Sequence, residues 1–254
     1  SKNNLHPSSE TSFHALINRK YVLHVHSTAT IANAISQSSG FDLRKYLDED
    51  FIFVPYCRPG FTLTMEIKKL ILPSTNILVL ENHGLIVAGD DIEDTYKLLL
   101  KIHEKLDLIR NEKLGLDYPE KITNIGGYIH KNTDKYKLFS TQNEKLFSLF
   151  SKSFYPDHVI FLGPGIPTFS EEKEANEFIQ NLKRKNINLP PYLIIKNKGL
   201  FENTLAIPAA KEMIDCFLEV LLRIDLSKSL KFLSNHQESE LLNWDIEIYR
   251  QSIN

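Results

Sequence analysis

The sequence predicts an α/β protein with a layered αβα arrangement around a central, largely antiparallel sheet, followed by a degenerate second copy of that arrangement. Three observations predict this fold. Short β-branched runs alternate with segments whose apolar residues recur at helical spacing. The chain has 254 residues and is 42% hydrophobic, enough for a sizeable core. The two halves also repeat one order of strand, turn, helix and strand.

In the first half, strands are expected where β-branched and aromatic residues dominate short runs: residues 21–26, 51–56, 77–80 and 85–88. Helices are expected where apolar residues recur at i, i+3 and i+4: residues 10–20, 28–37, 63–72 and 91–110. Asp90 and Asp91 favour the start of the last helix, because acidic groups complement the positive end of a helix dipole.

In the second half the same signals resume after a segment of glycines, a proline and scattered lysines and asparagines, which is typical of a connection. Strands are expected at residues 159–162 and 192–195, and helices at residues 171–185, 208–223 and 238–251. We therefore expect a first domain over residues 1–115, a linker over 116–133 and a second α/β domain over 134–254.

The internal repeat is clearest where ILVLENHGL in the first half corresponds to YLIIKNKGL in the second. This correspondence sets Asn82-His83-Gly84-Leu85 against Asn197-Lys198-Gly199-Leu200. A protonated lysine has no lone pair to offer a metal ion. If His83 is a metal ligand, the second copy has therefore lost it, and we expect no metal site in the second domain.

Composition excludes several classes of function. The formal net charge is −2, and acidic and basic residues are interspersed, so neither a nucleic acid nor an anionic membrane surface is expected as a partner. No apolar run approaches the roughly 20 residues of a membrane span. Cys57 and Cys216 lie far apart and form no CxxC motif, which favours free thiols and a cytoplasmic protein.

Two histidines are the first candidates for chemistry. His24 and His26 lie two residues apart in an expected strand, so their side chains project from the same face, about 6.5–7 Å apart. Two imidazoles placed in this way can share one metal ion. An HxH pair in a strand is, however, more often explained by packing or by surface exposure, so further ligands are needed.

Glu10 and His83 are the further candidates. Glu10 stands at the start of an expected helix that leads into the histidine strand. His83 follows the end of a strand and precedes Gly84, which allows the sharp turn that would expose the histidine. Each residue alone has a structural explanation, because Ser8 or Ser9 could cap the helix and Glu10 could complement its dipole.

Taken together, these motifs resemble the class II aldolase/adducin family. The resemblance covers roughly the first 110 residues, is specific for the family, and says little about the substrate. Its residues are Pro7-Ser8-Ser9-Glu10-Thr11, Phe13-His14-Ala15, VLHVHS at 22–27, VPY at 54–56 and Leu80-Glu81-Asn82-His83-Gly84-Leu85. Members of the family usually have several dozen residues before the Pro-Ser-Ser-Glu motif, with a Gly-Asn loop that completes a phosphate pocket, and this loop has no counterpart in the sequence.

The resemblance implies a role for each matching residue. His24, His26 and His83 correspond to the three ligands of a divalent metal ion. Zinc is the expected ion, with manganese, cobalt or iron as alternatives. Glu10 corresponds to the catalytic acid/base, and Ser8 and Ser9 to the pair that holds a substrate phosphate. His14 is expected to be a packed or supporting histidine rather than a ligand.

The function expected from this resemblance is that of a metal-dependent lyase of the class II aldolase type. Retro-aldol cleavage, or related enediolate chemistry, would act on a small hydroxy-carbonyl compound such as a sugar phosphate. Epimerisation, dehydration and decarboxylation would use similar groups. The resemblance also implies a homo-oligomer. Two alternatives remain: a non-catalytic, adducin-like assembly protein, and a three-histidine metal hydrolase.

Overall fold

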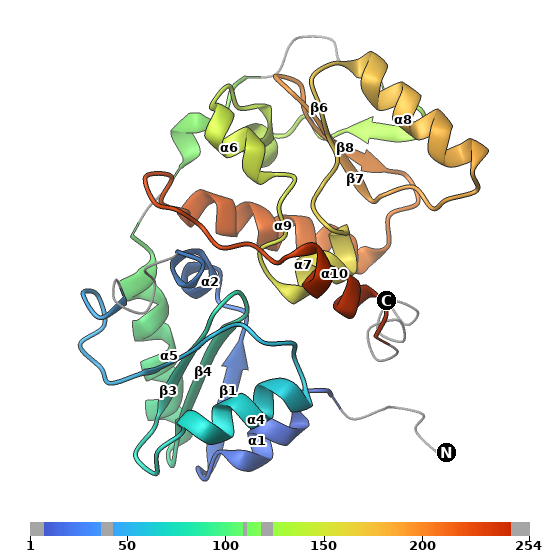
Figure 1. Cartoon of the computed structure of the whole chain (residues 1–254). Helices are drawn as coiled ribbons and strands as arrows, with labels where there is room; N and C mark the ends of the chain where they lie inside the picture. The colour runs from blue at the N-terminus through green and yellow to red at the C-terminus, as the bar shows by residue number, and fades with distance from the viewer. Residues whose placement is uncertain (1–7, 37–42, 109–110, 118–123, 245–254) are drawn as a thin grey trace. The chain divides into compact units, whose positions relative to one another are not determined.

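The computed structural model describes residues 8–36, 43–108, 111–117 and 124–244. The chain divides into two compact units, Ser1–Leu108 and Ile109–Asn254 (Figure 1). Among the described residues, none of the helices combines the length and the apolar character that crossing a bilayer would require. The two units are therefore described one at a time.

The first unit contains one four-stranded sheet in the order β1-β4-β3-β2. Its strands are β1 (Tyr21–Val25), β2 (Ile52–Val54), β3 (Ile77–Leu80) and β4 (Gly84–Gly89). β4 pairs antiparallel with both β1 and β3, while β2 pairs parallel with β3. Since β2 and β3 run in the same direction, the segments that follow them emerge at the same end of the sheet.

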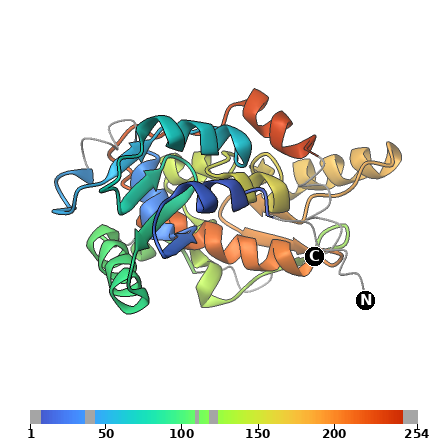
Figure 2. The same ribbon diagram turned by 90° about the horizontal axis from the view of Figure 1, so that it is seen from below.

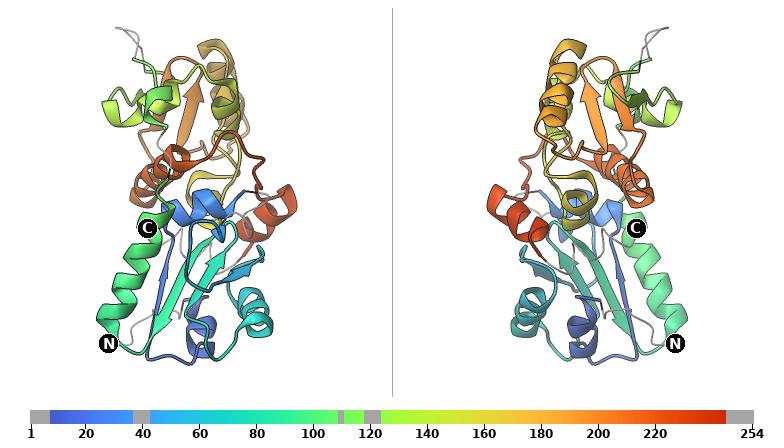
Figure 3. Two further views of the ribbon diagram at one scale, coloured as in Figure 1. Left: turned by 90° about the vertical axis from the view of Figure 1, so that its left-hand side faces the viewer. Right: turned by 90° about the vertical axis from the view of Figure 1, so that its right-hand side faces the viewer.

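Helices cover both faces of this sheet, as expected for an αβα arrangement (Figures 2 and 3). The helices are α1 (Thr11–Leu16), α2 (Thr28–Ala34), α4 (Phe61–Leu70) and α5 (Ile92–Leu106). The α1 and α4 side of the sheet buries a cluster that includes Phe13, Ile67 and Leu78. The α2 and α5 side buries a second cluster, which includes Val87 and Ile102.

Local sequence explains where these helices begin. Asp91 caps α5 by accepting a hydrogen bond from the backbone N–H of Asp94 at 3.0 Å. Ser27 caps α2, because its hydroxyl oxygen accepts from the N–H of Thr30 at 3.2 Å. The cap at Ser27 fixes the chain one residue after His26, so the start of α2 also sets the end of the histidine strand.

The second unit contains another four-stranded sheet, in the order β5-β8-β7-β6. The strands are β5 (Tyr128–His130), β6 (Thr168–Phe169), β7 (Tyr192–Ile195) and β8 (Gly199–Asn203). β8 pairs antiparallel with β5 and β7, and β6 pairs parallel with β7. Strand order and direction therefore repeat those of the first sheet, as expected for a second copy.

Helices also lie on both faces of the second sheet (Figure 3). The elements are η1 (Glu112–Leu114), η2 (Asp134–Ser140), α6 (Glu144–Leu149), α7 (Pro156–Leu162), α8 (Glu172–Arg184), α9 (Pro208–Arg223) and α10 (Asn235–Leu242). α8 stands between β6 and β7 in the chain, as α4 stands between β2 and β3. The cluster beneath α8 includes Ala175, Ile179 and Phe201.

Several sequence expectations differ from the structure, beginning with a predicted strand in the second half. Residues 159–162 were expected as a strand but belong to α7, a helix that begins at Pro156 and is buried at all seven positions. A short apolar run buried on every side has no periodicity, so a strand and a helix look alike in the sequence. The parallel partner of β7 is instead β6, at residues 168–169.

The domain limits also differ from the expected ones. The first unit ends at Leu108 rather than at residue 115. Residues 128–130, which were expected within the linker, form β5, an edge strand too short to be recognised by alternation. Of the helix expected over 238–251, the structure describes α10, which ends at Leu242, and residues 245–251 lie outside the described residues.

Candidate metal centre

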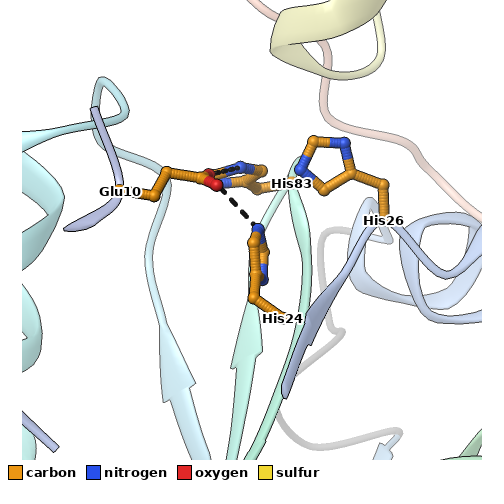
Figure 4. Close-up of side chains that lie close together, drawn as sticks. All are labelled: Glu10, His24, His26 and His83. Atoms are coloured by element: carbon orange, nitrogen blue, oxygen red, sulfur yellow. Dashed lines mark ion pairs between the residues drawn. The ribbon is translucent and has the colours of Figure 1, made fainter. Parts of the chain in front are cut away.

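The structure brings together four side chains that sequence analysis singled out: Glu10, His24, His26 and His83 (Figure 4). His24 lies on β1, and His26 follows the last residue of that strand. His83 lies in the turn between β3 and β4. Glu10 immediately precedes α1. Three separate parts of the chain therefore supply the group.

The turn that carries His83 is built from its neighbours. Asn82 has a φ of 52°, a left-handed conformation that asparagine tolerates better than most residues. The N–H of His83 donates to the carbonyl of Leu80 at 3.2 Å and closes the turn. At Gly84 an added Cβ would lie 2.5 Å from the carbonyl oxygen of Val25, so only glycine lets the turn approach β1 this closely.

The distances are those of a compact group. Glu10 Oε1 lies 3.2 Å from His24 Nε2 and 3.1 Å from His83 Nε2. The imidazole centroids are 5.0 Å apart for His24 and His26, 5.1 Å for His24 and His83, and 4.9 Å for His26 and His83. One ligand atom from each of the four residues lies within 4.8 Å of every other.

Hydrogen bonding fixes the tautomer of His24. Its Nδ1 lies 3.1 Å from the carbonyl oxygen of Leu85, so Nδ1–H donates to that oxygen. In the neutral ring, Nε2 then carries a lone pair that points at a carboxylate oxygen of Glu10. Two acceptors facing each other repel unless a proton or a cation lies between them. Nε2 of His24 is in fact buried without a hydrogen-bond donor among the described residues.

The electrostatics of the group favour metal binding. Burial raises the pKa of Glu10, but the close contacts with His24 and His83 lower it by more, so the pKa lies well below its ordinary value. Burial lowers the pKa of His83 to about 4, although Glu10 opposes this shift. At neutral pH Glu10 is therefore an anion and His83 is neutral, which are the protonation states that metal ions bind.

Surrounding residues, through contacts that the sequence does not reveal, hold the histidines in place. The ring of Phe13 packs edge-on against His24, with centroids 5.3 Å apart. His103 of α5 lies with Nδ1 2.9 Å from the hydroxyl of Ser27. Ser27 is the residue after His26, so this contact ties the histidine strand to α5. The pairing of Ser27 with His103 depends on how α5 packs, and no spacing in the sequence reveals it.

The other predicted residues lie beside the group. Ser8 is exposed, and its hydroxyl oxygen accepts from the N–H of Glu10 at 3.2 Å. Ser9 is half-buried and directly precedes Glu10. His14 stacks on Phe13 with centroids 4.7 Å apart, in keeping with a packed rather than a ligating histidine. Its pKa is lowered by burial and by His24.

The four residues fit a divalent metal ion. Three imidazoles and one carboxylate form the donor set expected for zinc, and also suit manganese, cobalt or iron. The buried, unpartnered Nε2 of His24 points into the group, which is the arrangement expected where a cation completes the site. The bond between Nδ1–H and the Leu85 carbonyl orients the ring, as outer hydrogen bonds commonly orient metal-ligating histidines.

Comparisons with known proteins find similarity to the first part of this chain. Residues 1–108 match the family described as Class II Aldolase and Adducin N-terminal domain. The chain is 30% identical over 111 residues to the Uncharacterized oxidoreductase YuxG of Bacillus subtilis (strain 168). That alignment covers 43% of this chain and 16% of YuxG, so the chain spans about a sixth of the length of that relative.

One solved structure is also similar, the N-terminal Class II Aldolase domain of a conserved protein from Thermoplasma acidophilum. The sequence identity is 30%, and the match covers 39% of this chain and 46% of the other, with a TM-score of 0.37. The family match ends at residue 108, where the first compact unit also ends. All four residues of the candidate metal centre lie within it.

Proposed function

We propose that this chain, whose residues 1–108 belong to the Class II Aldolase and Adducin N-terminal domain family, is a metal-dependent lyase of the class II aldolase type. Its reaction would be the retro-aldol cleavage, or a related enediolate reaction, of a small hydroxy-carbonyl compound such as a sugar phosphate. The observation that carries the proposal is the contact of one Glu10 oxygen with Nε2 of both His24 and His83.

A divalent ion, with zinc as the first choice, would be held by His24, His26 and His83. When bound, it would supply a Lewis acid that polarises the substrate carbonyl and stabilises the negative charge that develops there. Three neutral imidazoles would leave the charge of the ion uncancelled. His24 is held by the Leu85 carbonyl, so the site is organised before substrate arrives.

Glu10 would move the proton. In a retro-aldol cleavage the carbon–carbon bond breaks, a substrate hydroxyl loses its proton to become an aldehyde, and the carbon beside the carbonyl gains a proton. Glu10 is an anion at neutral pH, because its contacts with His24 and His83 hold its pKa low. Its side chain is 22% exposed, so a bound substrate can reach the carboxylate and exchange a proton with it.

Ser8 and Ser9 would position an anionic group of the substrate. The Ser8 oxygen accepts from the N–H of Glu10, which leaves its own hydroxyl proton to donate. Ser8 and Ser9 directly precede Glu10, so a phosphate bound to them would lie beside the group that moves the proton. We also propose a homo-oligomer and, from the two free thiols of Cys57 and Cys216, a cytoplasmic location.

The test combines metal analysis with product analysis. Purified chain should contain a divalent metal, and with zinc restored it should release an aldehyde from some member of a panel of sugar phosphates and unphosphorylated hydroxy-carbonyl compounds. Release of an acid and an alcohol from ester substrates would point to a hydrolase instead. A metal-free chain that acts on no substrate would favour an adducin-like assembly role and would contradict the proposal.

A further inference from the structure

Glu81, the residue that follows β3, has a buried side chain to which the proposed reaction assigns no part. The residue is 6% exposed, and burying a carboxylate costs free energy unless hydrogen bonds compensate for the lost water. Its Oε2 accepts a hydrogen bond from the backbone N–H of Tyr56 at 3.0 Å, and its own N–H donates to the Val54 carbonyl at 2.9 Å. Glu81 therefore joins the end of β3 to the segment that follows β2.

The side chain of Glu81 accepts a hydrogen bond that a backbone carbonyl would accept in a regular sheet. β2 and β3 pair in parallel up to the last residue of each strand, so the residues that follow them, Pro55 and Glu81, face each other. If this ladder continued, the backbone carbonyl of Glu81 would accept from the N–H of Tyr56. At this point the chain turns at Asn82, with a φ of 52°, and the side chain of Glu81 accepts the bond. The turn that carries His83 is therefore fastened at its first residue to the segment after β2.

The second unit provides a comparison for this position. Lys196 follows β7 as Glu81 follows β3. Its N–H donates at 2.9 Å to the carbonyl of Phe169, the last residue of the parallel neighbour β6. The side chains differ, because Lys196 forms an ion pair with Glu144. The same backbone register is therefore built with a lysine at this position.

The backbone donor of the neighbouring segment is also bound in a different way. Glu171 corresponds to Tyr56, since each lies two residues after the end of its strand. The N–H of Glu171 donates to the Glu174 carboxylate at 3.3 Å, within the capping box of α8. The unit whose turn carries His83 thus satisfies this donor from the turn, whereas the second unit satisfies it from its own helix. This difference indicates that the fold itself does not require the bond made by Glu81.

We propose that Glu81 is a positioning residue of the metal centre, whose carboxylate anchors the turn so that the imidazole of His83 is held ready to bind the ion. His83 is 3% exposed and its Nε2 lies 3.1 Å from Glu10 Oε1, so a small shift of the turn would change the ligand group. This role rests on the metal centre of the proposed function and not on the reaction assigned to it. Groups that hold a metal ligand from behind commonly contribute about 10- to 100-fold to metal affinity.

Cobalt titration, followed by the visible absorption of the bound ion, tests this role without any substrate. Glu81→Met removes the acceptor at similar side-chain length and should weaken cobalt binding about 10-fold or more. Lys196→Met makes a matched replacement at the corresponding position of the second unit and should leave cobalt binding unchanged. An unchanged cobalt affinity in a folded Glu81→Met chain, or an equal loss in the Lys196 control, would overturn the proposal.

Two conservative variants keep the proposal testable if Glu81→Met does not fold. Glu81→Gln keeps an acceptor oxygen at the same reach and should bind cobalt like the parent. Glu81→Asp keeps a carboxylate but shortens the side chain by one methylene, so it should lose the bond to Tyr56 and bind cobalt about 10-fold more weakly. Parent-like binding by both variants, or by the Glu81→Asp chain alone, would show that the hydrogen bond does not position the site and would overturn the proposal.

The outcomes separate the role of Glu81 from the proposed reaction. If the expected cobalt affinities are found while no member of the substrate panel releases an aldehyde, the reaction is wrong and the role of Glu81 stands. A parent chain that binds no cobalt would contradict the metal centre and the role of Glu81 together.

Discussion

At the scale of single residues, the carboxylate of Glu10 lies in a half-buried group with the imidazoles of His24, His26 and His83. Glu10 Oε1 lies within 3.2 Å of Nε2 of both His24 and His83. Burial alone would penalise the carboxylate charge, and a neutral His24 presents it with a lone pair rather than a proton. A cation shared by these atoms would remove both costs, so the metal content of the protein is the first property to test.

His83→Ala should remove most of the bound divalent metal and leave the fold intact, because it deletes one of three imidazole donors from a turn whose backbone does not depend on the ring. Metal content after dialysis and a far-ultraviolet circular dichroism spectrum measure the two effects. His236→Ala, which removes a histidine that is 82% exposed on α10, is the matched control and should keep the metal. Full metal content in the His83 variant would contradict the assignment.

Glu10→Gln should keep the metal and lower the turnover rate by roughly 10²-fold or more, in line with the usual worth of general acid–base catalysis. The three histidines remain, whereas the amide cannot carry the proton. Steady-state rates together with metal analysis test this prediction. Glu93→Gln, which changes a first-turn acid of α5, is the control for a purely helix-stabilising role. Near-normal turnover in the Glu10 variant would mean that Glu10 acts only as a helix-start acid.

His158 is a buried histidine outside the candidate metal centre. It is fully buried on α7, its ring lies 4.5 Å from that of Phe217, and neither ring nitrogen has a hydrogen-bond partner among the described residues. Burial lowers its pKa to about 3. The unfolded chain therefore binds more protons than the folded chain between about pH 3 and the ordinary histidine pKa of about 6.5, and this group makes stability fall as the pH falls through that window.

His158→Phe should accordingly reduce the loss of stability between pH 6.5 and pH 4, because it removes a group that must stay neutral to remain buried. At pH 7 its stability should equal or exceed that of the parent, since an aromatic ring of similar size replaces two unsatisfied nitrogens. Urea unfolding at both pH values measures the difference. An unchanged pH dependence would assign the acid sensitivity to other groups.

At the scale of elements, the turn between β3 and β4 positions the site. Because the backbone approaches Gly84 closely, we expect Gly84→Ala to destabilise the fold strongly. The alanine Cβ would stand 2.5 Å from the Val25 carbonyl oxygen and 3.3 Å from the Cα of His26. Both neighbouring atoms belong to the backbone and cannot move without separating β1 from β4. We expect a loss of about 2–4 kcal/mol in the free energy of unfolding together with loss of metal.

Denaturant unfolding and metal analysis test the Gly84 variant. Ala88→Gly, which lies in the same strand and removes a Cβ instead of adding one, is the control. Ala88→Gly should lower the free energy of unfolding by about 0.5–1 kcal/mol, through chain entropy and lost packing. It should keep the metal, because residue 88 pairs with Val22 rather than with the histidine end of β1. Equal metal loss in both variants would show that general loosening of the sheet, rather than the turn, controls the site.

Elements differ in how far the sequence could predict them. Glu10, His24, His26 and His83, which the structure brings together, could be singled out because their motifs taken together resemble a known family, although each motif alone has a structural explanation. α7 could not be distinguished from a strand, since every one of its residues is buried. β5 was not predicted, because its three residues are identified as a strand only by their pairing with β8. His103 escaped notice because its partner, Ser27, is distant in the chain.

At the scale of the whole molecule, two copies of one strand order have different chemistry. Each sheet carries a left-handed asparagine followed by the turn residue that distinguishes the copies, His83 in the first and Lys198 in the second. The turn and the sheet register are therefore the same in the two units, although the residue between Asn and Gly differs. We therefore expect one metal ion per chain, bound in the first unit.

Bound metal should stabilise the unit that holds it. A ligand that binds only the folded first unit stabilises that unit by an amount that grows with the ratio of free metal to its dissociation constant, about 2.7 kcal/mol at a hundredfold ratio. The single tryptophan of the chain, Trp244, lies in the second unit and serves as its fluorescent probe. Adding a chelator should therefore lower the melting transition seen by circular dichroism and leave the transition seen by Trp244 fluorescence unchanged.

The His83→Ala chain should not respond to the chelator by either signal. Equal shifts in both signals would show that the two units unfold as one, and would refute the separation expected from their independent sheets.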